Sequence, residues 1–278
     1  MINLMRADLY RIVRGKGIYI ALALMIAMIG LSIYLCEAGS LALYVSTEAE
    51  INNDLDNMTY DEIQDLSRRE YREIMLRTTG YELDRDILAH NMNLYYVFIF
   101  VVAIVVAADF SGSCVKNTLS SSISRRQYFF AKLGFNTLCC LVLFFLNTYL
   151  SYFANIIFNN QNLASSLGTV TKISLMQLPP ILALVSILTG FSFILKRTAI
   201  FNTIMIPFFM IVQLLLSLAA NFLKLSEEQV SYDIQVMLSK LAYHPSDSYI
   251  LNSYIICGVV IIVFVLLGYL SFYKAEIK

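Results

Sequence analysis

The stretch DFSGSCVKNTLSSSISRRQYFFAK, residues 109–132, joins two long apolar runs at residues 93–108 and 129–158. Its charged residues are mostly basic: Lys116, Arg125, Arg126 and Lys132 against Asp109. Lysine and arginine are retained on the cytoplasmic side of membrane proteins. A short basic segment between two runs of membrane-spanning length is therefore typical of a cytoplasmic loop.

This loop has the spacing of a helix rather than that of a simple turn. Val115, Leu119 and Ile123 recur every four residues and would share one face. Arg126 would fall on the opposite, hydrated side. We expect a short helix that lies across the membrane surface and shows polar side chains to the cytoplasm, which is the form of a docking element. The alternative is an ordinary connecting loop whose cations reach toward water.

The composition places the chain among membrane proteins. Of its 278 residues, 58% are apolar and only 14% are charged, whereas a soluble domain carries about 25% charged residues. Several runs approach the ~20 apolar residues that cross ~30 Å of hydrocarbon. We expect an all-α, polytopic protein of the cell membrane that forms one domain, residues 1–278. Its six predicted spans are residues 17–36, 93–108, 129–158, 173–195, 199–220 and 253–273.

An amphipathic pattern over residues 1–16 precedes the first span. Five apolar residues share one face of a helical wheel: Ile2, Met5, Leu9, Ile12 and Val13. Asn3, Arg11 and Arg14 take the other face. Such a segment suits a helix in the plane of the interface, with Arg11 and Arg14 directed toward lipid phosphates. The alternative is an unstructured cytoplasmic tail.

Two polar segments, residues 37–91 and 221–252, are predicted to lie on the extracytoplasmic side. The first holds 13 acids and 5 bases. Its Thr59 and Glu62 have the spacing of a capping box, which predicts a helix at residues 60–77.

The third and fourth predicted spans are joined by residues 159–172, whose polar composition is typical of a short turn. The pair Pro179-Pro180 should kink or break the fourth span, because proline removes backbone donors. Pro207 lies inside the fifth span.

Six spans place both termini on the same side of the membrane, and the charge distribution selects that side. With the termini in the cytoplasm, the cytoplasmic segments carry 12 of the 20 bases and only 3 of the 20 acids. The outer segments then carry 8 bases and 17 acids. The opposite orientation would place the basic clusters outside, against the positive-inside rule. We therefore expect cytoplasmic termini.

The sequence lacks the motifs of several enzyme classes. It has no Gly-x4-Gly-Lys-Ser/Thr loop for nucleotide phosphates, no two histidines one helical turn apart and no Gly-x-Ser-x-Gly. The predicted spans carry essentially no charge at mid-depth, where ion-coupled carriers place such groups. We expect no enzyme activity, metal or cofactor in this chain. Its energy would then come from a soluble partner that docks on the basic loop.

The order of elements and the basic loop resemble the permease subunit of ABC-2-type exporters, especially the bacterial ones linked to peptide antibiotics and lantibiotic immunity. In that family the first cytoplasmic loop reads approximately Glu-x3-Gly-Thr-x-Lys-Asn-x-Leu-x2-Pro-Ile-Ser-Arg, followed by a lysine. The matching residues are Asp109, Lys116-Asn117, Leu119, Ile123-Ser124-Arg125 and Lys132. The chain departs from the pattern at four positions: Asp109 for Glu, Ser113 for Gly, Cys114 for Thr and Ser122 for Pro.

The resemblance implies a function and partners. In that family the loop is the coupling helix, which sits in a cleft of a separate ATPase subunit, and the N-terminal amphipathic segment is the connecting helix. Two permease chains and two ATPase chains form the transporter, and ATP and magnesium belong to the ATPase. The residues assigned in this way to ATPase coupling are Asp109, Lys116, Asn117, Leu119, Ser120, Ile123, Ser124, Arg125 and Arg126. The exported substrate would be amphipathic, such as a peptide or lipid-like antibiotic.

Two other functions are compatible with the sequence. One is a membrane sensor or immunity protein that binds a cationic ligand through the acidic segment 37–91. The other is an intramembrane enzyme, for which Asn147, Asn202 and Gln213 are the polar residues within spans, although no acid–base set accompanies them.

Overall fold

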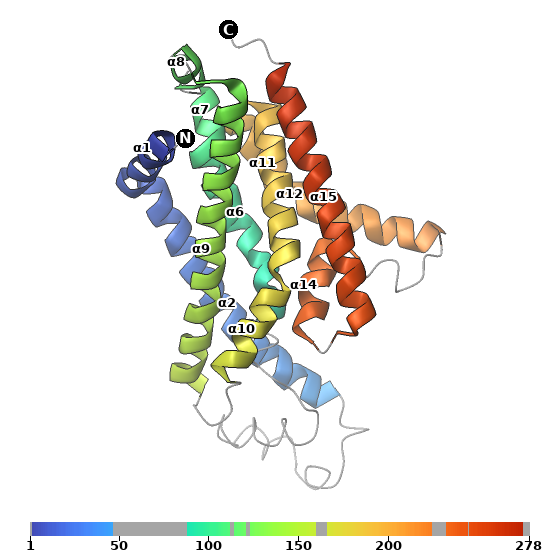
Figure 1. The fold of residues 1–278 in the computed structure, drawn as a ribbon. Coiled ribbons are helices and arrows are strands. Elements are labelled where there is room, and N and C mark those ends of the chain that lie inside the picture. Colours follow the sequence, from blue (N-terminus) through green and yellow to red (C-terminus); the bar gives the residue numbers. More distant parts are fainter. Residues whose placement is uncertain are drawn as a thin grey trace, which may run out of the picture.

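The computed structural model describes residues 2–46, 88–111, 114–120, 123–159, 166–223, 232–243 and 245–274. All regular secondary structure within these residues is helical, and the helices pack into an elongated bundle (Figure 1). In this part of the chain, four helices are long and apolar enough to cross a membrane, or five if the bent pair α1 and α2 counts as one span. The predicted all-α class is confirmed, and the long apolar helices agree with a membrane protein.

In chain order the elements are α1 (Ile2–Arg14), α2 (Lys16–Ser46), the 3-10 turn η1 (His90–Asn93), α6 (Leu94–Val102), the π-helical turn η2 (Ala103–Ala107), α7 (Ala108–Ser111), α8 (Cys114–Ser120), α9 (Arg125–Asn159), α10 (Leu167–Met176), α11 (Leu178–Leu195), α12 (Thr198–Leu223), α14 (Ile234–Ala242) and α15 (Asp247–Tyr273). The helix predicted at residues 60–77, with its capping box, lies outside the described residues.

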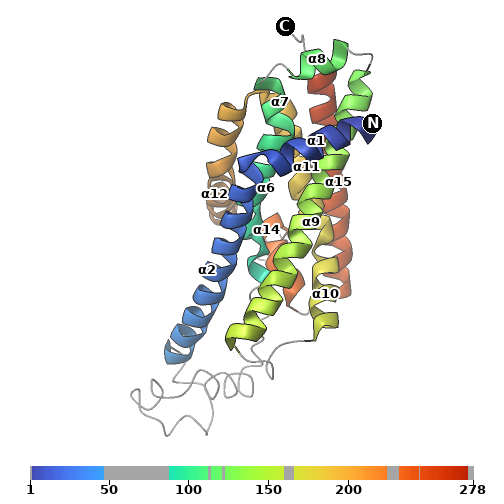
Figure 2. The same cartoon turned by 90° about the vertical axis from the view of Figure 1, so that its left-hand side faces the viewer.

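The first two helices meet at a sharp bend. Segments Leu4–Arg14 and Lys16–Ser32 differ in direction by 66°, and Figure 2 shows α1 crossing near one end of the bundle while α2 runs along it. Gly15 occupies the bend, where a Cβ would lie only 2.9 Å from the carbonyl oxygen of Arg11. α2 continues to Ser46, beyond the predicted end at residue 36, because alanine and leucine keep residues 37–46 favourable to a helix.

α6, η2 and α7 form a shorter apolar stretch, Leu94–Phe110, inside the bundle. Nearly all side chains of α6 and η2 are buried. A helix that is apolar on every side needs partners all round, and α2, α9, α11 and α12 provide them. This stretch corresponds to the predicted span 93–108.

The predicted break in the fourth span is confirmed, and it falls just before the two prolines. Gln177 forms a turn between α10 and α11, and Pro179 and Pro180 occupy the first turn of α11. Proline is tolerated there because the first N–H groups of a helix have no partner within it.

Two segments predicted from their polar composition contain more helix than the sequence indicated. The turn predicted at 159–172 is helical in its second part, because Ser166 caps the start of α10 by accepting a hydrogen bond from an N–H of the first turn. The polar segment 221–252 contains α14 and the beginning of α15. α14 buries Met237 and Leu238 completely, so this part of the segment belongs to the packed bundle.

α11 and α15 pack closely at a pair of glycines. A Cβ on Gly190 would lie 2.7 Å from the carbonyl oxygen of Phe264, and a Cβ on Gly268 would lie 3.0 Å from the Cα of Gly190. Small residues allow membrane helices to approach in this way. By contrast, the C-terminal part of α12 projects to the side of the bundle (Figure 1). α12 contains Pro207, which removes one hydrogen bond from the helix and favours a kink.

Candidate docking surface and the charge cluster behind it

α8 forms where the sequence predicts a short helix, and it buries the predicted apolar face. Figure 2 shows it lying crosswise at the end of the bundle, beside α7. Val115 is buried, and Leu119 and Ile123 are partly buried against the core. The other residues of α8 that were predicted to couple are Lys116 and Asn117, which are exposed, and Ser120, which ends the helix. The apolar face of this segment therefore points into the molecule and its polar face outward.

The next predicted coupling residues, Ser124, Arg125 and Arg126, stand at the start of α9. Ser124 and Gln127 form a reciprocal cap: the Gln127 N–H donates to Ser124 Oγ at 3.2 Å, and the Ser124 N–H donates to Gln127 Oε1 at 3.3 Å. Arg125 donates to the carbonyl oxygen of Tyr273 at 2.6 Å. Two of the three thus make contacts that hold helix ends in place, whereas Arg126 is exposed.

Behind α8, a buried group of charged side chains joins α1, α7 and α9. The side chain of Lys132 is 1% exposed. Its ammonium nitrogen lies 2.6 Å from Asp8 Oδ1 and 2.5 Å from Asp109 Oδ2, and it donates to the carbonyl oxygen of Val105 at 3.1 Å. Both carboxylates are buried as well. These contacts are needed because an unpaired ion in the interior costs roughly several kcal/mol.

Arg11 completes this group from α1. Its guanidinium pairs with Asp109 and donates to the carbonyl oxygens of Ile104 and Val105 at 3.0 and 3.1 Å. Both carbonyls belong to η2, where the π-helical pairing displaces carbonyl groups from the regular α-helical ladder. The prediction that Arg11 points toward lipid phosphates is wrong, because Asp109 and these carbonyls hold the guanidinium against the protein.

Tyr128 adds the last polar contact. Its hydroxyl donates to Asp109 Oδ2 at 2.6 Å, and its ring packs on Phe272 of α15, with centroids 5.5 Å apart. The Asp109 carboxylate is therefore bound by side chains from both α1 and α9. We call Asp8, Arg11, Asp109, Tyr128 and Lys132 the charge cluster. It contains two cations and two carboxylates, so its formal charges balance.

Sequence reasoning placed Asp109 at the docking loop and Lys132 at the end of the family pattern, but it assigned neither Asp8, Tyr128 nor Lys132 to the site. Two signals were present. Asp8 is the only acid of residues 1–16 and stands three residues before Arg11. Lys132 lies within a predicted span, where an ionisable residue is expected to have a partner.

A second buried polar group, which carries no charge, joins η1, α9, α14 and the turn at Gln177. The Gln177 side chain donates to the carbonyl oxygens of Leu88 and Leu238 at 3.0 and 2.7 Å. Asn91 donates to Gln177 at 2.7 Å, and Asn147 donates to Asn91 at 3.1 Å. This amide group satisfies the polar atoms at the helix break, and it explains the burial of Asn147 without a catalytic role. Gln213, also considered for an intramembrane enzyme, is exposed on α12.

Within the described residues, no group of three or more His, Cys, Asp or Glu side chains could hold a metal ion. The site instead consists of α8, whose polar face is exposed and available for contact with another protein, and of the charge cluster behind it. No protein-family model matches this chain, and no curated protein matches it.

Proposed function

We propose that this chain is the permease subunit of an ATP-driven exporter of the ABC-2 type. The observation that carries the proposal is α8, a short helix across the end of the bundle whose apolar face is packed inside and whose polar face, with Lys116, is exposed. The ATPase that docks on it, with its ATP and magnesium, is a separate subunit.

The proposed route from the docking surface to the spans runs through α7. α7 precedes α8 in the chain, and its Asp109 is held by Arg11 of α1 and by Lys132 of α9. A displacement of α8 would therefore be transmitted to α7, α1 and α9 together. Because the Lys132–Asp109 pair is buried and the Arg11–Asp109 pair is partly buried, separating them costs more than separating a surface pair. The three elements would consequently move together when the ATPase changes shape.

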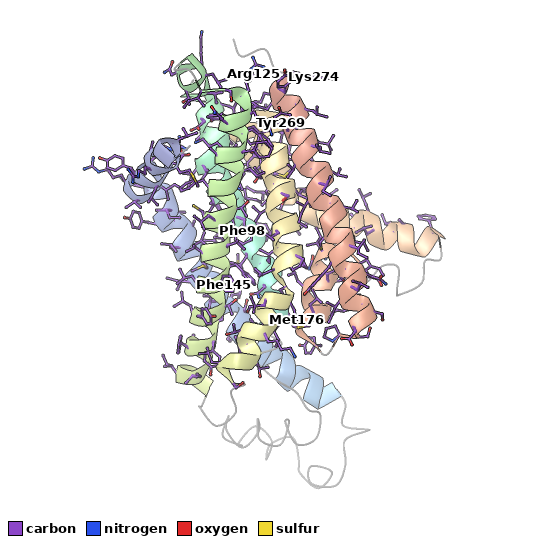
Figure 3. All side chains as sticks on the ribbon, viewed as in Figure 1. Phe98, Arg125, Phe145, Met176, Tyr269 and Lys274 are labelled. Carbon is purple, nitrogen blue, oxygen red and sulfur yellow. The ribbon has the colours of Figure 1, made fainter. Side chains whose placement is uncertain are left out.

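The proposed topology has six spans: α2, the stretch from α6 to α7, α9, the broken pair α10 and α11, α12 and α15. α1 lies at the cytoplasmic interface, and both termini are cytoplasmic. In support, α1, α8 and the C-terminal end of α15 gather toward the same end of the bundle (Figures 1 and 2). Arg125 and Lys274 lie at that end as well (Figure 3), as the positive-inside rule requires of a cytoplasmic side.

The proposed transporter contains a second permease copy, or a related chain, beside the two ATPases. α12 supports this part of the proposal, because it buries little against its own chain and exposes Met210, Leu214 and Leu215. The proposed substrate is an amphipathic peptide or lipid-like antibiotic, since the spans supply aromatic and neutral polar groups.

The central test is a photo-crosslinking residue at position 116, on the exposed face of α8, in cells that contain the natural partners. We expect the main product to contain a protein with a P-loop. The matched control carries the same residue at Lys172, an exposed cation on α10 toward the other end of the bundle, and should not capture that protein. Products at position 116 without a P-loop protein would contradict the proposal.

A charge reversal gives an independent check. Lys116 and Arg126 are both exposed on the docking side, so the double variant Lys116→Glu/Arg126→Glu should lower recovery of the ATPase with the purified chain by about tenfold. The chain itself should be recovered at normal yield, because neither side chain is buried. Undiminished recovery of the ATPase would show that this surface is not the docking site.

A further inference from the structure

The outward face of α1, together with Lys16 at the start of α2, carries a strip of cationic and aromatic side chains. Arg6, Tyr10, Arg14 and Lys16 are all exposed, and the apolar Leu9 and Val13 lie along one edge of the strip, also exposed. The guanidinium of Arg14 lies over the ring of Tyr10, 4.9 Å from its centroid. We call these six residues the cationic strip.

The strip has a single sign of charge because the acid of α1 is turned away from it. Asp8 is 4% exposed and is held inside by Lys132 at 2.6 Å and by Arg11 at 3.3 Å. Asp109 draws Arg11 inward as well. The charge cluster thus neutralises one acid and one base of α1, and the other charged residues of this helix, Arg6 and Arg14, are positive and exposed.

The order of side chains around α1 matches the layers of a membrane surface. At 100° per residue, the exposed arc passes from Leu9 and Val13 through Arg6 and Tyr10 to Arg14. Apolar residues suit the acyl region, and aromatic and basic residues suit the headgroup region. The bend at Gly15 turns α1 across the bundle, so that the part of the strip on α1 can lie along the surface of one leaflet, and Lys16 follows directly after the bend.

We propose that the cationic strip binds the headgroups of anionic phospholipids. The guanidinium groups of Arg6 and Arg14 can each donate two hydrogen bonds to phosphate oxygens, and the Lys16 ammonium adds a further positive charge. Each cation beside an anionic membrane strengthens the attraction about fivefold. The inference rests on the membrane placement in the proposed function, but it does not require that an ATPase docks on α8.

The absence of tryptophan from this chain makes a local test simple. Leu9→Trp would place a single tryptophan at an exposed position of the strip. The full chain would be reconstituted in phosphatidylcholine vesicles that contain equal fractions of either brominated phosphatidylglycerol or brominated phosphatidylcholine. We expect the anionic lipid to quench the tryptophan fluorescence more strongly, and we expect high salt to reduce the difference.

Charge variants in the Leu9→Trp background identify the groups responsible. Arg6→Gln/Arg14→Gln should lower the preference for the anionic lipid by about 25-fold, since each cation contributes about fivefold. Arg6→Lys/Arg14→Lys keeps the charge and should retain most of the preference, which also shows that the site tolerates substitution. The matched control, Lys116→Gln/Arg126→Gln, removes two exposed cations from α8 and α9 and should leave the preference unchanged.

Three results would overturn the inference. Equal quenching by the two brominated lipids would show that the strip does not select charge. An equal loss of preference in the control variant would show a general effect of net charge rather than a site on α1. Absence of quenching by either lipid would show that the strip faces water or a protein partner. None of these results depends on ATPase docking, so failure here and failure of the proposed function can be told apart.

Discussion

Replacement of Lys132 by methionine should destabilise the protein strongly. The ammonium nitrogen lies within 2.6 Å of carboxylate oxygens of both Asp8 and Asp109 and also bonds the carbonyl oxygen of Val105. Methionine has a similar length but no charge, so the change leaves packing largely intact and removes the cation. Loss of one partner from a buried ion pair costs about 3–5 kcal/mol, because the remaining carboxylates stay buried. We expect a loss of stability in this range.

The measurement is unfolding of the purified full chain in mixed micelles of increasing sodium dodecyl sulfate content, followed by circular dichroism. The matched control is Lys116→Met, which removes an exposed lysine from α8. A surface substitution of this kind should stay within about 0.5 kcal/mol of the unmodified protein.

A double variant separates the loss of charge balance from a simple loss of packing. Asp8→Asn/Lys132→Met removes one carboxylate together with the cation, so it should be more stable than the sum of the two single losses predicts. Neighbours in one ionic network show such interaction energies of about 0.5–3 kcal/mol. Strictly additive losses, or a Lys132→Met variant as stable as the control, would refute the view that this cluster is a buried network.

The remaining predictions address packing, backbone strain, pH and topology. Gly268→Leu should cost about 1–3 kcal/mol or more, since even a Cβ there would lie 3.0 Å from the Cα of Gly190; unchanged thermal stability would contradict this packing. Lys196 ends α11 with φ of 54°, so Lys196→Gly should raise stability by about 1 kcal/mol, and Lys196→Ala should not. Burial raises the pKa of the Asp233 carboxyl above 3.8 despite backbone N–H donors at the start of α14, so its contribution to stability is present below pH 3.8 and is lost as pH rises through the raised pKa. Asp233→Asn should therefore gain stability relative to the unmodified protein at neutral pH but not at pH 3, and a constant difference would contradict the assignment. Cysteines introduced at Asp65 and Glu228 should react with a reagent added outside the cell and those at Arg125 and Lys196 should not; the reverse pattern would overturn the proposed topology.

The long apolar helices were predictable because span length and hydropathy are properties of a continuous segment. The predicted span 129–158 corresponds to α9, and 253–273 corresponds to the larger part of α15. The break near Pro179 was predictable for the same reason, since proline acts on its own helix. The apolar face of α8 also followed from local spacing, because Val115 and Leu119 lie one turn apart.

The place of α14 in the packed bundle could not be predicted in this way. Its buried residues Met237 and Leu238 stand in a segment that also contains Glu227, Glu228 and Lys240, so the average composition is polar. Its place in the bundle depends on contacts with distant parts of the chain, such as the bond from Gln177 to the carbonyl oxygen of Leu238. The apolar spacing of Met237, Leu238, Leu241 and Ala242 is itself helical, but it does not show which distant residues the helix packs against.

The charge cluster was hidden for a related reason. A helical wheel groups Arg11 with Arg14 on one polar side of α1, but it cannot show that Asp109, about a hundred positions later, faces one of them and not the other. The structure separates two bases of α1. Arg11 binds Asp109 and a backbone carbonyl group of η2, whereas the side chain of Arg14 is exposed.

This division also bears on the orientation of the chain, because a cation neutralised inside the protein should not count toward the positive-inside rule. The segments assigned to the cytoplasm hold 12 bases and 3 acids, a surplus of nine positive charges. Arg11 and Lys132 are balanced by Asp8 and Asp109 within the charge cluster. When these four are removed, ten bases and one acid remain, and the surplus is still nine. The cluster therefore contains equal numbers of cations and anions from the segments assigned to the cytoplasm. The charge asymmetry that supports the proposed orientation rests on residues outside the cluster, including the exposed Arg14, Lys116 and Arg126.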